Sequence, residues 1–203
     1  MRRLEVRLDW GNQAIRVGTI GEQDRRVYFE YDAALLGDSL PLSPFKLPVR
    51  PGVIAFTETD FARVFGLFND SLPDGWGLLL MDREFRKRGR DPATLSVLDQ
   101  LAYIGTRAMG ALTYHPPERD EDGESLVADL GALAHQATRV LEGSAEDLLP
   151  ALRIAGGSPG GARPKVLVAV GADEQIIAGA TRVPDGYRQY LVKFPATDRK
   201  SVV

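Results

Sequence analysis

The chain has 203 residues, of which 44% are hydrophobic and 26% are charged, so it can bury a sizeable core and extensive disorder is not expected. Its net charge of −3 supplies no overall basic field, which argues against nucleic acid as the main ligand. Because it has no cysteine and no apolar run near the ~18 residues of a membrane span, we expect no disulfide, no thiolate metal site and no membrane contact, but a soluble cytoplasmic α+β protein.

The N-terminal quarter of the chain predicts a small antiparallel sheet with one buried face. Apolar and polar residues alternate over 4–9, and after a turn at 10–12 a second apolar run continues over 15–20, which indicates a hairpin. Residues 27–31 are typical of a third strand. From 40 to 51, four prolines favour an irregular loop.

Helices are expected to dominate residues 59–105. Asp91 followed by Pro92 is a favourable helix start, because aspartate caps free amides and proline suits the first turn. Gly105 is the matching stop. The face of this helix that is expected to pack consists of Leu95, Leu98, Leu101 and Ala102.

Strands and helices follow one another in the second half of the chain. A strand over 111–114 and a polar surface connection over 116–124 precede an amphipathic helix over 126–141. Ser144 with Asp147 resembles a capping arrangement before a shorter helix. Further strands are expected at 166–170, at 176–177 and at 190–194.

The segment 156–165 is rich in glycine. Four glycines within six residues let a backbone approach a phosphate closely. The segment is not a Walker loop, because Val166 follows Lys165 where a serine or threonine would hold magnesium, and it lacks the G-x-G-x-x-G spacing of ordinary protein kinases. From these residues alone, a phosphate-binding loop and a plain turn before the next strand both stay open.

Lys193 lies inside an apolar strand, between Val192 and Phe194. A charged amine there must point outward or find an anionic partner. Kinases use such a strand lysine to hold ATP phosphates. An outward lysine on an alternating strand is the other interpretation that the residues allow.

Two other groups of polar residues give weaker indications. His115 and His135 are isolated and lack the paired spacing of a metal site, so no metal site is predicted. The basic residues within 83–90 are typical of a solvated helix end, although an acidic partner surface or a DNA backbone could also contact them.

Four segments resemble, in order, the HipA family, the kinase toxins of bacterial toxin–antitoxin modules. Residues 68–77, FNDSLPDGWG, are similar to its F-x-x-L-L-P-D-[GS] motif, and residues 98–105 with 110–112 resemble its helix, turn and Gly-Ala-Leu strand. Residues 157–165 resemble its loop S-x-x-G-A-x-x-K, from which Pro159 and the second glycine depart, and residues 192–195 resemble its L-K-[LF]-P strand.

The resemblance implies a fold and a nucleotide site. A small antiparallel β-sheet subdomain with helices is expected over 1–115, and a helical connection with a kinase-like small lobe over 116–203. ATP and Mg²⁺ are the implied cofactors of the whole kinase, with Lys193 contacting ATP and with the phosphate-covering loop formed by Gly160, Gly161 and Ala162. Ser158 matches the serine whose autophosphorylation switches the family's kinases off, since a phosphate adds about −1.5 to −2 charge where ATP phosphates bind.

No catalytic residue is predicted in this chain. Kinases place the base and the magnesium ligands well after the lysine strand, and after Lys193 the only acidic residue is Asp198. We therefore expect the N-terminal part of a HipA-like protein serine/threonine kinase, truncated and inactive alone, whose parent phosphorylates a protein such as an aminoacyl-tRNA synthetase. The alternative is a non-catalytic module that binds a cognate HipB-like helix-turn-helix antitoxin and meets DNA only through it.

Overall fold

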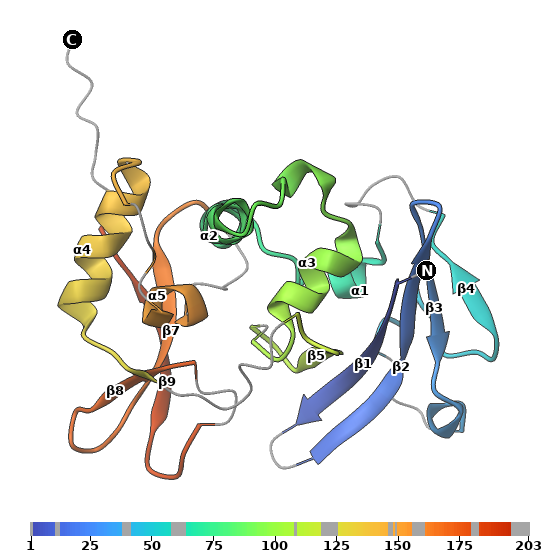
Figure 1. Cartoon of the computed structure of the whole chain (residues 1–203). Helices are drawn as coiled ribbons and strands as arrows, with labels where there is room; N and C mark the ends of the chain where they lie inside the picture. Colours follow the sequence, from blue (N-terminus) through green and yellow to red (C-terminus); the bar gives the residue numbers. More distant parts are fainter. Residues whose placement is uncertain are drawn as a thin grey trace. The chain divides into compact units, whose positions relative to one another are not determined.

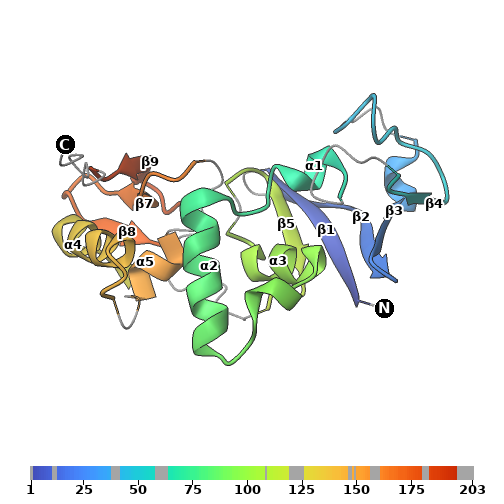
Figure 2. The ribbon, with the colours of Figure 1, turned by 90° about the horizontal axis from the view of Figure 1, so that it is seen from above.

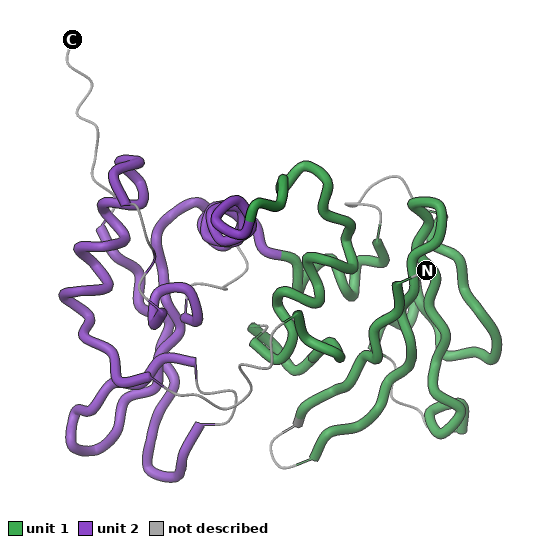
Figure 3. The backbone as a smooth tube through the Cα atoms, viewed as in Figure 1, with its two compact units in different colours: residues 1–72, 89–120 green, residues 73–88, 121–203 purple. Residues whose placement is uncertain are grey.

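The computed structural model describes residues 2–10, 13–37, 42–57, 64–107, 109–118, 126–145, 148, 150–155, 161–179 and 183–195. The chain divides into two compact units (Figure 3). Unit 1 contains residues 1–72 and 89–120, and unit 2 contains residues 73–88 and 121–203. No helix within the described residues is long and apolar enough to cross a bilayer.

Unit 1 is built on a five-stranded antiparallel sheet in the order β4-β3-β2-β1-β5 (Figure 1). Its strands are β1 (Arg2–Trp10), β2 (Gln13–Gln23), β3 (Arg26–Tyr31), β4 (Val53–Ala55) and β5 (Leu112–His115). The predicted hairpin and third strand are thus confirmed. A β-bulge after Val6 makes Val17 the additional residue of β2, and its side chain is fully buried.

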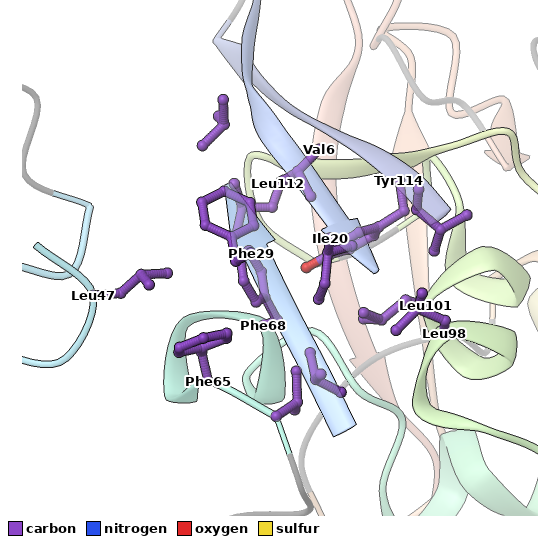
Figure 4. Close-up of a cluster of buried hydrophobic side chains, with 14 of the residues drawn as sticks. Val6, Ile20, Phe29, Leu47, Phe65, Phe68, Leu98, Leu101, Leu112 and Tyr114 are labelled. Atoms are coloured by element: carbon purple, nitrogen blue, oxygen red, sulfur yellow. The ribbon is translucent and has the colours of Figure 1, made fainter. Parts of the chain in front are cut away.

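The helices of unit 1 are η1 (Ala33–Leu35), α1 (Gly66–Asn69), η2 (Pro92–Thr94) and α3 (Val97–Ile104). The core combines aliphatic side chains with a group of aromatic rings (Figure 4). The ring of Phe29 lies 4.9 Å from that of Tyr31 and 5.0 Å from that of Phe68, centroid to centroid, and Phe68 lies 6.4 Å from Tyr114. The alternate residues Leu4, Val6 and Leu8 of β1 are also buried, so the sheet has one buried face, as expected.

The start of the helix predicted at Pro92 was wrong. The carboxylate of Asp91 caps only the short η2 turn, and Leu95 is extended with ψ 130°. Helix α3 begins at Val97 because Ser96 and Asp99 form a capping box, in which each side chain accepts a hydrogen bond from the other's amide. The predicted end at Gly105 is confirmed.

Unit 2 contains a four-stranded antiparallel sheet in the order β6-β8-β7-β9. Its strands are β6 (Leu126–Val127), β7 (Lys165–Val170), β8 (Ile176–Ala178) and β9 (Arg188–Lys193), and its helices are α2 (Gly75–Lys87), α4 (Leu130–Leu141) and α5 (Pro150–Ala155). Helix α5 contacts β7 and β8 (Figure 2). The two antiparallel sheets with their helices confirm the α+β class.

The amphipathic helix predicted over 126–141 is shorter at its start. Leu126 and Val127 pair with β8 instead, and Asp129 caps α4 by accepting the Ala132 amide at 2.6 Å. Ser144 donates to the Arg139 carbonyl at the end of α4, while Asp147 lies outside the described residues. The spacing of apolar residues could not show that residues 126–127 form a short strand and not the first turn of the helix, because the strand depends on pairing with β8, which is distant in the sequence.

Candidate functional site

Two lysines face each other at one end of the unit 2 sheet. Lys165 is the first residue of β7, Lys193 is the last residue of β9, and the two are direct partners in the antiparallel register. Directly opposed residues carry their side chains on the same face of a sheet. The Lys193 side chain is exposed, whereas Lys165 is only 3% exposed. Two cationic groups therefore lie opposite each other at this end of the sheet, one exposed and one buried.

The ammonium of Lys165 has a hydrogen bond to the backbone and an electrostatic interaction with a carboxylate. Its Nζ donates to the carbonyl oxygen of Gly161 at 2.7 Å. Burial lowers the pKa of Lys165 below its ordinary value, while the carboxylate of Asp74 raises it and the ammonium of Lys193 lowers it further. Asp74 and both lysines thus act on one another electrostatically.

The first turn of α2 contacts the C-terminal part of the glycine-rich segment, residues 161–165, which we call its exit. The amide of Trp76 donates to the Gly161 carbonyl at 3.2 Å, so an amide that the helix leaves without an internal partner is satisfied. Gly75 and Gly161 both have positive φ, at +44° and +82°, which favours glycine at each position.

The exit of the glycine-rich segment is also bonded to the end of β9. Phe194 donates its amide to the Pro164 carbonyl at 2.9 Å, and Arg163 donates from Nε to the Phe194 carbonyl at 2.8 Å. The Phe194 side chain is buried in the hydrophobic core of unit 2 together with Trp76. The residue before Lys165 and the residue after Lys193 are therefore hydrogen-bonded to each other.

Several of the predicted site residues lie in this region. Gly161, Ala162 and Lys193 are described, and Ala162 is exposed, whereas Ser158 and Gly160 lie outside the described residues. The sequence did not predict a separate role for Lys165 or Asp74. Lys165 is the last residue of the S-x-x-G-A-x-x-K loop and the first of an apolar strand, where a charged side chain needs a partner, so its position could have indicated a role.

The basic cluster within 83–90 is largely engaged in contacts inside the chain. Arg83 donates to the carbonyls of Val140 and Ala145 at 3.0 and 3.1 Å. Arg88 pairs with Glu84 at 2.6 Å, and Arg90 bonds to Asp99 and Glu118. Arg83, Arg88 and Arg90 are therefore hydrogen-bonded or ion-paired within the chain.

Histidines and metal ligands add little to the site. His135 is exposed on α4, and the Nε2 of His115 lies 3.1 Å from the hydroxyl of Thr113. Among the residues that the structure describes, no three or more histidine, aspartate or glutamate side chains are grouped to hold a metal ion. The ammonium groups of Lys165 and Lys193 are of the kind that attract an anion.

These features define an α+β protein in which a glycine-rich segment leads into an antiparallel sheet with two opposed lysines. A family model described as the HipA N-terminal domain matches residues 9–115, more than half of the chain. The chain therefore belongs to the HipA family, as its motifs predicted. No curated protein matches it significantly.

Proposed function

We propose that this chain is the N-terminal part of a HipA-type protein serine/threonine kinase. In this proposal the glycine-rich segment with Gly160, Gly161 and Ala162 covers the phosphates of ATP, and the exposed ammonium of Lys193 contacts them. ATP supplies the phosphoryl group that such kinases transfer, and Mg²⁺ neutralises charge on its phosphates.

The observation that carries the proposal is the pairing of Lys193 with Lys165 at the exit of the glycine-rich segment. Two like charges on directly opposed residues repel each other, and a bound anion relieves that repulsion. Phosphate oxygens provide this negative charge. The membership in a kinase family that uses ATP gives the anion its proposed identity.

Calorimetric titration of Mg·ATP into the 203-residue chain tests the nucleotide site. We expect binding by the wild type and about tenfold weaker binding by Lys193→Met, because one charge-assisted contact to phosphate is lost. Arg188→Met is the matched control, since Arg188 is an exposed cation on the same strand. Equal affinity of the two variants, or no binding by the wild type, would contradict the proposal.

The proposal also holds that these residues do not transfer the phosphoryl group by themselves. Phosphoryl transfer needs a base and metal ligands, and among the residues that the structure describes no three or more histidine, aspartate or glutamate side chains are grouped to hold a metal ion. Incubation with labelled ATP and Mg²⁺ should leave Ser158 unlabelled in the isolated chain. Ser158 is then the proposed target of the whole kinase, where a phosphate would exclude ATP by charge. Labelling of Ser158 by the isolated chain would rule this part out.

A second candidate function is binding of a cognate HipB-like helix-turn-helix antitoxin. It is favoured by the match to the HipA N-terminal domain and by two strongly exposed apolar side chains of unit 1, Phe45 at 92% and Val53 at 63%. Co-purification with the helix-turn-helix protein encoded beside this gene tests it. Phe45→Asp should weaken that complex, and failure of the wild type to bind would count against this candidate.

A further inference from the structure

Lys165 is charged and almost completely shielded from water, at 3% exposure. A buried ammonium is costly unless it is hydrogen-bonded and paired with opposite charge. The rest of β7 consists of alanine, leucine and valine, so Lys165 is the only charged residue of an apolar strand. Packing therefore does not account for the charge of Lys165, and its contacts must be considered.

The acceptor of the Lys165 ammonium is a carbonyl that a second donor also uses. Gly161 accepts from Lys165 Nζ at 2.7 Å and from the Trp76 amide at 3.2 Å. One donor belongs to a strand and the other to the first turn of a helix. The carbonyl of Gly161 is thus held from two elements that lie far apart in the sequence.

We propose that Lys165 is a positioning residue, which holds the Gly161 carbonyl against the first turn of α2 and so fixes the exit of the glycine-rich segment beside Lys193. We call the hydrogen-bonded set of Lys165, Gly161 and Trp76 the clamp. Its hydrogen bonds exist without a nucleotide, whereas its role in binding rests on the proposed nucleotide site.

The charges around the clamp couple it to anion binding. Asp74 favours the ammonium of Lys165, and Lys193 opposes it. An anion that contacts Lys193 offsets this opposition and so strengthens the bond from Lys165 to Gly161. By thermodynamic linkage, a formed clamp favours the anion by the same factor.

Amide hydrogen exchange of Trp76, followed by nuclear magnetic resonance without nucleotide, tests the clamp. In Lys165→Met, the exchange rate of this amide should rise by about tenfold or more, because Gly161 loses a charged donor and opens more often. The amide of Ala128, which donates to Ile176 elsewhere in unit 2, is the internal control and should not change. An unchanged rate at Trp76 would overturn the proposal.

A chemical rescue separates the charge of Lys165 from its volume. The chain contains no cysteine, so Lys165→Cys has a single thiol, which can be alkylated in denaturant before refolding. Alkylation by 2-bromoethylamine restores an ammonium of nearly the original length, whereas 1-bromopropane adds an uncharged chain of the same size. Protection of the Trp76 amide should return only with the ammonium. Equal protection by both adducts, or protection by neither, would overturn the proposal.

Failure of this inference is distinguishable from failure of the proposed function. The exchange measurements contain no nucleotide and depend on Lys165. The titration with Mg·ATP depends on Lys193. If the Trp76 amide responds to Lys165 but Mg·ATP does not bind, the clamp stands and the nucleotide site is wrong. If Mg·ATP binds through Lys193 but Trp76 does not respond, the nucleotide site stands and the clamp is wrong.

Discussion

A Cβ atom built on Gly75 would lie 2.6 Å from the carbonyl carbon of Gly161, closer than real Cβ atoms approach backbone. Gly75 also has a φ of +44°, which side chains rarely adopt. It belongs to the Leu-Pro-Asp-Gly motif, residues 72–75, which the sequence presents only as a family resemblance. The contact gives the glycine of that motif a physical reason, because the helix can meet the glycine-rich segment only where no side chain intervenes.

The first prediction concerns Gly75→Ala, compared with Gly89→Ala. Gly89 also has positive φ, at +71°, but nothing lies within 4 Å of its added Cβ. Gly89→Ala should lower the free energy of unfolding by about 1 kcal/mol through backbone strain alone. Gly75→Ala should cost about 1–3 kcal/mol more, because the backbone of Gly161 must move. Urea unfolding measures both, and equal losses would contradict the contact.

A second prediction concerns the buried hydroxyl of Tyr114, which donates to Ser71 Oγ at 2.7 Å. Tyr114→Phe should lower the free energy of unfolding by about 1–3 kcal/mol, since the Ser71 hydroxyl loses a buried partner. The control is Tyr187→Phe, which removes an exposed hydrogen bond to Gln175 and should change stability by less than about 0.5 kcal/mol. A cost for Tyr187→Phe as large as that for Tyr114→Phe would argue against a role for burial.

The third prediction is a loss of stability at alkaline pH. Burial raises the pKa of both Tyr114 and Tyr31 above the ordinary value of 10.0. The folded chain keeps these protons where the unfolded chain releases them, so the stabilisation is complete below about pH 10 and is lost as the pH rises beyond it. Urea unfolding between roughly pH 8 and 11 should show this decline. Tyr114→Phe should make it shallower, and an identical slope would refute the assignment.

A fourth prediction concerns Arg83, whose guanidinium donates to the carbonyls of Val140 and Ala145 at and beyond the end of α4. Arg83→Met should lower the free energy of unfolding by about 1–3 kcal/mol, because those carbonyls lose a charged donor. Arg86→Met, an exposed position on the same helix, should change it by less than about 0.5 kcal/mol. Thermal unfolding of the two variants gives the comparison, and similar melting temperatures would count against the contact.

Local sequence patterns predicted most elements of the fold. The hairpin, the third strand and the strands around 166–170, 176–177 and 190–194 follow from alternation and β-branched runs. The errors lie at helix starts. Asp91-Pro92 looked like a helix start, yet the capping box of Ser96 and Asp99 begins the helix one turn later. Two cap sequences lay close together, and propensity alone does not rank them.

The candidate site was predictable only in part. Lys193 was expected on a strand and lies on β9, while its contact with ATP stays a prediction. The burial of Lys165 could not be inferred, because its acceptor is the backbone carbonyl of Gly161, and the sequence does not show where a carbonyl points. The meeting of Gly75 with Gly161 likewise joins segments far apart in the chain, which no local pattern encodes.

The opposed lysines of β7 and β9 have a consequence for the balance between stability and activity. Like charges directly opposite one another weaken a pair of strands, so the sheet is less stable with Lys193 than with a neutral residue there. Lys193→Met is therefore expected to raise the melting temperature of the chain while weakening its contact with ATP. A higher melting temperature together with a lower affinity for ATP would show that Lys193 lowers the stability of the sheet and serves ligand binding.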